Sequence, residues 1–112
     1  THPMHFHLVN AQVLSRQPFI LPAGGGAPTP SGVPRGPDAN ELGWKETIKM
    51  HPGEVTSILM KFDLPPNPAL IVGGTMPIPL SNRTGVVGNE YVWQCHILEH
   101  EEHDMMRPLV VT

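Results

Sequence analysis

Proline and glycine interrupt this chain so often that long helices and long inner strands are excluded. The 112 residues include 14 prolines and 11 glycines, and most of these lie within residues 16–43 and 63–89. Proline removes a backbone donor and glycine costs conformational entropy inside a regular element, so both stretches are predicted to be irregular loops. The segments between them are short and rich in β-branched and aromatic residues. The sequence therefore predicts an all-β chain.

Five strands are expected outside these loops. Their predicted bounds are residues 6–14, 44–50, 55–62, 91–95 and 107–111, with a turn at 51–54 and one helical turn within 96–103. Short strands joined by long loops are typical of a Greek-key β-sandwich or barrel, which is the fold class that we expect. Such a fold needs more than five strands, and the chain begins at Thr1 without an initiator methionine. We therefore expect residues 1–112 to be one incomplete domain that lacks its N-terminal strands.

Charge and hydropathy argue against two classes of partner. The formal net charge is −3, and the seven Lys and Arg residues are scattered, so no basic patch points to nucleic acid or to an anionic membrane. No stretch approaches the roughly 20 apolar residues of a membrane span, so none is expected. The single cysteine, Cys95, cannot form a disulfide within the chain. It is expected to be a buried apolar residue, a reactive thiol or a metal ligand.

Six of the seven histidines lie near one end of the chain or the other. The two groups are His2, His5 and His7 near the start, and His96, His100 and His103 near the end. Cys95 belongs to the second group, and Met105 follows it. Imidazoles, a thiolate and a thioether are the ligands that a copper ion of changing oxidation state selects. The array Cys-His-x₃-His-x₄-Met, joined to His-x-x-His-x-His, therefore predicts a copper site.

One local loop supplies most of a mononuclear site. Cys95 and His100 are separated by a tight turn, and Met105 follows one turn later, so only His2 comes from elsewhere in the chain. Two histidines and a cysteine with a weak axial methionine form the ligand set of a blue-copper electron-transfer site. We expect these four residues to bind one copper ion.

Alternation of side chains along extended segments predicts a second metal region. His5 and His7 then point the same way, and His2 is offset towards the other side. Cys95 likewise projects from one face of its strand, while His96 projects from the opposite face. A single strand could in this way contact two metal centres and carry electrons between them.

Each of these residues also has a structural interpretation. A single buried cysteine is more often a small apolar residue than a ligand, and a methionine pair near a chain end is usually part of a core. A histidine-rich terminus can be an expression tag, although interleaved proline, methionine and phenylalanine argue against one. Metal binding is favoured because all of the residues occur together at this spacing. We expect His51 and His103 to be surface residues, and Asn82-Arg83-Thr84 fits a glycosylation sequon.

At these residues the chain resembles the C-terminal cupredoxin domain of a three-domain multicopper oxidase, in the branch of the bacterial spore-coat laccases and bilirubin oxidases. The resemblance spans the chain and is weakest in the two loops. Its motifs are residues 2–9, 43–47, 52–55, 91–93 and 95–106. It implies that residues 1–112 are the C-terminal part of such a domain, with copper as cofactor and the remaining domains of the enzyme, on the same or a separate chain, as partners.

The resemblance also implies a type 1 copper site. His2, Cys95 and His100 would be its ligands, and Met105 would be its axial ligand. Electrons from a phenol or a related small-molecule reductant would enter near His100 and leave through Cys95. They would pass to a trinuclear copper cluster that reduces dioxygen to water.

The cluster would share its ligands between domains. By resemblance, His5 would bind the type 2 copper, and His7 and His96 would bind the type 3 pair, while the remaining histidines come from another domain. By the same resemblance, Glu101 would assist proton delivery to the cluster. Members of this family are mostly secreted, periplasmic or part of the spore coat, so an extracellular, periplasmic or spore-coat location is expected.

One residue departs from the family pattern. The family has His-Cys-His, whereas this chain has Gln94 before Cys95. An amide is a poor copper ligand beside imidazole. We therefore predict weak or absent occupancy of one type 3 ion and slow oxygen reduction, with type 1 copper intact.

Three other copper-dependent functions compete with that of a laccase. An electron-transfer cupredoxin with type 1 copper alone leaves His5, His7 and His96 without a role. A copper nitrite reductase uses a histidine before the cysteine and needs none after it, which is the reverse of this sequence. Oxidation of a metal ion such as Mn²⁺ or Cu⁺ is a variant of the oxidase hypothesis, and the absence of a methionine-rich segment disfavours Cu⁺.

Overall fold

The structure is a computed structural model, and it describes residues 1–63 and 80–112. Short antiparallel strands dominate these residues. The elements in chain order are β1 (His2–Phe6), β2 (Ala11–Ile20), β3 (Thr29–Pro30), the 3₁₀ turn η1 (Ala39–Glu41), β4 (Thr47–Met50), β5 (Glu54–Met60), β6 (Asn89–Cys95), α1 (Leu98–Glu102) and β7 (Met106–Val111). The all-β expectation is confirmed. No helix within the described ranges has the length and apolar character needed to cross a bilayer.

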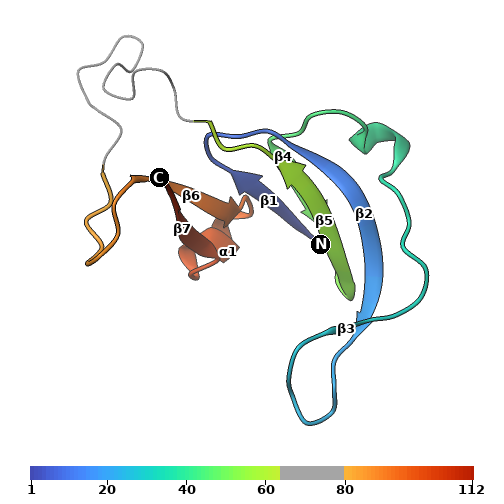
Figure 1. The fold of residues 1–112 in the computed structure, drawn as a ribbon. Helices are drawn as coiled ribbons and strands as arrows, with labels where there is room; N and C mark the ends of the chain where they lie inside the picture. The colour runs from blue at the N-terminus through green and yellow to red at the C-terminus, as the bar shows by residue number, and fades with distance from the viewer. Residues whose placement is uncertain (64–79) are drawn as a thin grey trace.

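The strands form two sheets. The first has the order β4-β1-β6-β7 and the second has the order β3-β2-β5. All neighbouring strands are antiparallel. Figure 1 shows β6, β7 and α1 on one side of the molecule and β2, β3 and β5 on the other, with β1 between them. This arrangement is part of a cupredoxin-like β-sandwich, and it places the first strand of the chain beside one of its last.

The first predicted strand, residues 6–14, is wrong. β1 ends at Phe6 and β2 begins at Ala11, and the two strands belong to different sheets. Between them Leu8 has φ 76°, a left-handed conformation that breaks an extended strand. Apolar and polar residues continue to alternate across this break, so the pattern merged two strands into one.

The predicted loop at residues 16–43 is partly wrong. β2 continues to Ile20, and a register shift between Val13 and Ser15 keeps it paired with β5. Pro18 lies at the last pair of this ladder, opposite Glu54, where a strand tolerates a missing donor. β3 and η1 also lie within the stretch, whose other residues are irregular. With β1 separate from β2 and with β3 added, the described residues form seven strands instead of five.

The C-terminal half agrees with the prediction more closely. β4, β5 and β7 lie within or one residue outside their predicted ranges, and β6 begins two residues earlier, at Asn89. The helical turn expected within 96–103 is α1. Residues 64–79 of the second predicted loop lie outside the described residues, and 80–88 form a bend closed by an isolated bridge between Leu80 and Asn89.

A small core joins the two sheets. Ala11 and Val13 of β2 and Ile48 of β4 are buried together, and Phe6, Ile58 and Met60 pack against them at its edge. This core lies over β1 and β4. None of the residues of this cluster belongs to β6 or β7.

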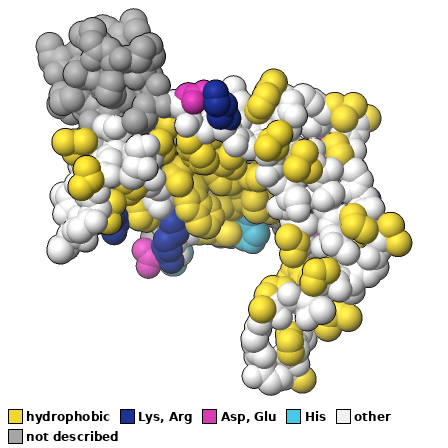
Figure 2. Space-filling model, viewed as in Figure 1, with side chains coloured by type: hydrophobic (Ala, Val, Ile, Leu, Met, Phe, Trp, Pro, Cys, Tyr) yellow, Lys and Arg dark blue, Asp and Glu magenta, His cyan; other side chains and the backbone are white. Residues whose placement is uncertain are grey.

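An apolar groove of about 470 Å³ lies beside the core, and its lining residues are Phe6, Met50, Met60, Phe62, Trp93 and Leu109. The Phe6 and Trp93 rings stack with centroids 6.4 Å apart. Figure 2 shows a broad apolar surface across the middle of this view. Apolar surface is normally buried in a soluble domain. An exposed apolar groove of this kind is consistent with a sandwich that lacks some of its strands, as expected from the sequence.

A buried ion pair fastens the long loop to the sheets. Arg16 of β2 is fully buried and donates two hydrogen bonds of 2.7 Å to the Glu41 carboxylate and one of 2.8 Å to the Lys49 carbonyl. The Arg16 hydrogen bond is the main cause that lowers the pKa of Glu41, and burial opposes it. The ion pair thus holds η1 against β2 and β4.

Candidate metal centre

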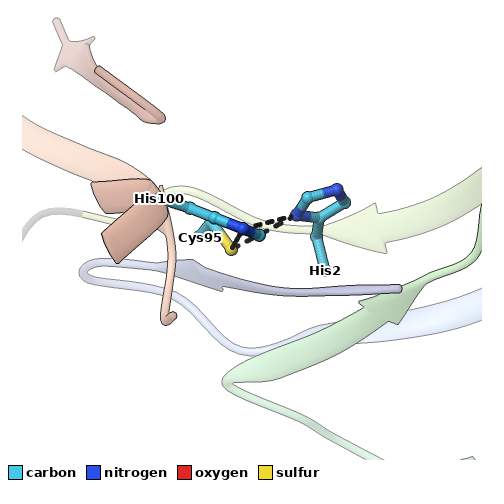
Figure 3. A group of neighbouring side chains, drawn as sticks. All are labelled: His2, Cys95 and His100. Carbon is cyan, nitrogen blue, oxygen red and sulfur yellow. Dashed lines mark hydrogen bonds between the residues drawn. The ribbon is translucent and has the colours of Figure 1, made fainter. Parts of the chain in front are cut away.

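Three side chains from distant parts of the chain converge on one point. The Nδ1 atoms of His2 and His100 are 3.1 Å apart, and each lies 3.6 Å from the Cys95 sulfur. Figure 3 shows both rings directed at each other and at the sulfur. A point equidistant from three atoms so spaced lies about 2.0 Å from each, close to the 2.0–2.3 Å at which protein nitrogen and sulfur bind a metal ion. The group can therefore enclose one ion.

Strand pairing sets this geometry. β1 and β6 are neighbours, with Met4 opposite Cys95, so His2 projects from the same face of the sheet as Cys95. The His96 backbone N–H donates to the Pro3 carbonyl at 2.7 Å and fixes the end of β6 against β1. Cys95 is fully buried, which keeps water away from its sulfur.

The loop after β6 returns the chain to the site. α1 carries His100, whose carbonyl accepts a hydrogen bond of 2.9 Å from the Met105 N–H. The Met105 carbonyl in turn accepts one of 2.9 Å from the Cys95 N–H. Asp104, with φ 68°, makes the turn between them. Met105 is half-buried and tied to two of the converging residues through its backbone, and the role of its sulfur as axial ligand stays a prediction.

A second group of imidazoles surrounds His5. The His5 ring centroid lies 5.2 Å from that of His7 and 5.7 Å from that of His96, and both neighbours are steeply tilted to it. His5 lies opposite Gln94 in the ladder, so this group occupies the face of β6 away from Cys95. The structure thus brings together each histidine set predicted from alternation, although His7 lies one residue beyond the end of β1.

The second group is more open than the first. Within the ranges that the structure describes, only His2, Cys95 and His100 bring three possible ligand atoms within 4.8 Å of one another. His5 and His7 line a depression of about 440 Å³, together with Phe6, Leu8, Val9, Asn10, Glu46 and Tyr91. His96 is exposed. Unlike the first group, the second therefore does not by itself bring three ligand atoms around one point.

Electrostatics connect Glu101 with this group. Burial lowers the pKa of His7, the neighbouring His5 lowers it further, and Glu101 acts in the opposite direction. Glu101 is half-buried in α1, where its N–H donates to the Ile97 carbonyl at 2.9 Å. Its carboxylate is therefore close enough to influence His7, and its part in proton delivery stays a prediction.

The remaining predicted residues fall on the surface or beside the site. Gln94 is buried between His5 of β1 and Met106 of β7. Its amide occupies the position of the first histidine in the His-Cys-His pattern described above. His103 is exposed, as expected. His51 is half-exposed, and its Nδ1 lies 3.0 Å from the Thr1 hydroxyl, a contact that the sequence did not indicate. Asn82 is exposed, so the sequon is accessible.

Comparison with known proteins agrees with this geometry. Residues 1–70 match the family model described as multicopper oxidase. The chain is 41% identical to a laccase of Bacillus subtilis (strain 168) over 100% of its own length, and 39% identical to a laccase of Bacillus stratosphericus over 97%. It is also 41% identical, over 65% of its length, to multicopper oxidase LPR1 of Arabidopsis thaliana, of which it covers 11%.

The chain belongs to the multicopper oxidase family. It spans 18% of the length of each of the two bacterial laccases. A multicopper oxidase binds copper, and the residues present fit that metal, because two imidazole nitrogens and one buried sulfur converge at metal–ligand distance. The pairing of β1 with β6 brings histidines from the two ends of the chain together.

Proposed function

We propose that residues 1–112 form the C-terminal part of a cupredoxin domain in a laccase-type multicopper oxidase. Such an enzyme would oxidise phenols or related compounds and reduce dioxygen to water. One observation carries the proposal. The group of His2, Cys95 and His100 and the group of His5, His7 and His96 lie on opposite faces of β6, one residue apart at Cys95 and His96.

The first group fits type 1 copper. His2 and His100 would bind it through Nδ1, since these atoms face each other and the sulfur, and Met105 would be the axial ligand. Copper bound there supplies one-electron transfer. The ligands come from paired strands and a hydrogen-bonded loop, and ligands held in place by the fold change little between oxidation states.

The chain also provides a short route between the two groups. Cys95 and His96 are joined by one peptide bond, and the His96 ring lies beside that of His5. Electrons leaving the Cys95 sulfur would reach the second group through covalent bonds alone. His5 would bind type 2 copper, and His7 and His96 would bind the type 3 pair.

Two residues would set the rate of oxygen reduction. Glu101 would relay protons to the cluster, and its carboxylate lies close enough to His7 to oppose the lowering of the pKa of that ring. Gln94 would leave one type 3 ion with an imidazole too few, so its occupancy and the turnover rate would both be low. Bacterial relatives more than five times as long support the view that the other cluster ligands belong to further domains of the same enzyme.

The proposal is tested on the longer polypeptide that contains these residues. Purified protein is loaded with copper, and copper content, the copper–thiolate absorption band and oxygen consumption with 2,6-dimethoxyphenol are measured. We expect a blue protein that consumes oxygen slowly, and Cys95→Ser is expected to lose the band and at least one copper ion. Ser57→Ala, on the exposed side of β5, is the control.

The outcomes separate the candidate functions. Colour with one copper ion and no oxygen consumption identifies an electron-transfer cupredoxin. Colour and copper content unchanged in Cys95→Ser contradict any role of the first group in binding copper.

A further inference from the structure

His5 differs from His2 and His100 in what its Nδ1 atom contacts. The His5 Nδ1 lies 2.8 Å from the Glu46 carbonyl oxygen and 3.3 Å from the Thr47 hydroxyl oxygen. Both partners belong to the segment that enters β4, and Thr47 lies directly opposite His5 in the β1–β4 ladder. The contacts are therefore fixed by strand register rather than by a flexible side chain.

These contacts determine which nitrogen carries the proton. A carbonyl oxygen can only accept, so a hydrogen bond of 2.8 Å to Glu46 requires a proton on the His5 Nδ1. In a neutral imidazole the other nitrogen, Nε2, then has the free lone pair. His2 and His100 present Nδ1 to the sulfur instead. His5 is thus prepared to bind a metal through a different nitrogen from His2 and His100.

The Glu46 carbonyl has room for a second donor. The Phe6 backbone N–H approaches it at 3.4 Å, and a carbonyl has two lone pairs. The neighbouring residue Thr47 is half-buried, and its hydroxyl offers the His5 Nδ1 proton a second acceptor. Together the two oxygens restrict both the tautomer of His5 and the rotation of its ring.

We propose that Thr47 and the Glu46 carbonyl are positioning groups that hold His5 for copper binding through Nε2. This inference rests on the proposed function, because it requires copper at the second histidine group. Hydrogen bonds from the non-ligating nitrogen commonly orient a metal-binding histidine, and their loss weakens metal binding by 10- to 100-fold. Since the Glu46 carbonyl remains when only Thr47 is changed, the expected effect lies at the lower end, about tenfold.

The test uses the copper-loaded longer polypeptide with Thr47→Val, which replaces the hydroxyl by a methyl group of similar size. Thr47→Ser keeps the hydroxyl and should restore wild-type behaviour. Thr29→Val makes the same chemical change on exposed β3 and is the matched control. Type 1 absorption reports in every variant whether the domain has folded.

Two properties are measured. The first is copper affinity of the second group by competition with a chelator, and Thr47→Val should weaken it about tenfold. The second is the electron spin echo modulation from the imidazole nitrogen that does not bind copper. Its coupling responds to the hydrogen bond that this nitrogen makes, so it should change in Thr47→Val and match the wild type in Thr47→Ser and Thr29→Val.

The possible failures are distinguishable. Unchanged affinity and modulation in Thr47→Val, with copper present at the second group, overturn the positioning role and leave the proposed function standing. Copper binding by His5 through Nδ1 would likewise overturn the positioning role and leave the proposed function standing. A wild-type protein that binds type 1 copper alone would overturn both the positioning role and the proposed function.

Discussion

At the scale of residues, Cys95 and His96 show how one strand can serve two chemical environments. They are consecutive, yet the first is fully buried with His2 and His100 and the second is exposed beside His5. Residue type and period-two alternation were sufficient to predict both groups, because ligands are recognised by their side chains. The Glu46 carbonyl could not be found in this way, since every residue has a carbonyl and only register selects the one that His5 contacts.

Gln94 provides the prediction at this scale. Gln94→His would place an imidazole on the face of β6 that carries His5, at a position already buried between β1 and β7. We expect copper content to rise by about one ion per polypeptide and oxygen consumption with a phenol to increase, because imidazole is the stronger copper ligand. Elemental analysis and an oxygen electrode provide the measurements.

Gln94→Asn is the control for this change, because it alters the side chain without adding an imidazole. Equal copper content in Gln94→His and the unchanged protein would contradict the claim that Gln94 lowers copper occupancy at the second histidine group.

At the scale of elements, tertiary contacts decided the boundaries that sequence patterns missed. β1 and β2 were merged in the prediction because nothing in the residue type of Leu8 signals its left-handed backbone. The proline and glycine content of residues 16–43 predicts a loop that begins too early, whereas pairing with β5 keeps the first part of this segment extended. The Arg16–Glu41 ion pair was also missed, since its partners are 25 residues apart and meet only after the sheets have formed.

This ion pair predicts how stability depends on pH. Glu41 has a lowered pKa in the folded chain, so its contribution is fully present above the unfolded value of about 4.3 and is lost as the pH falls through the folded value. Glu41→Gln leaves the Arg16 charge buried without its partner, which costs about 3 kcal/mol. Urea unfolding of the copper-free protein at neutral and acidic pH measures both effects.

The two effects can be separated by comparing pH values. The stability difference between Glu41→Gln and the unchanged protein should shrink below pH about 4. Glu102→Gln, an exposed carboxylate in α1, should change stability little at any pH. A stability loss of the same size at both pH values would contradict the assigned cause.

At the scale of the whole molecule, the chain is a partial sandwich whose fold class was predictable and whose sheet order was not. Frequent proline and glycine left only short strands, which indicated an all-β fold. The placement of β1 between β4 and β6 depends on contacts across most of the sequence, and local patterns contain no information about it. The same non-local pairing creates the groove beside Trp93 and Leu109, where the inner face of the four-stranded sheet is uncovered.

We expect further strands of the longer polypeptide to cover this groove. Leu109→Lys should then destabilise that polypeptide by about 2–3 kcal/mol, because a charge would be placed against a newly buried apolar surface. Val33→Lys is the comparison, since Val33 is 86% exposed in the long loop and should tolerate the charge. Thermal unfolding of both variants provides the measurement, and equal stability would show that the groove stays open.

The convergence of His2 and His100 has a consequence for folding. These residues are 98 positions apart, so an ion bound between them cross-links the first strand to the last helical turn. By analogy with a covalent bridge that closes a loop of about 100 residues, such a link disfavours the unfolded ensemble by roughly 4–5 kcal/mol. Bringing residues this distant in sequence together early in folding costs much conformational entropy. The ion would therefore stabilise a chain that has already folded rather than start its folding. Chelation would then remove this link and lower the free energy of unfolding, and urea denaturation with and without copper would measure the loss.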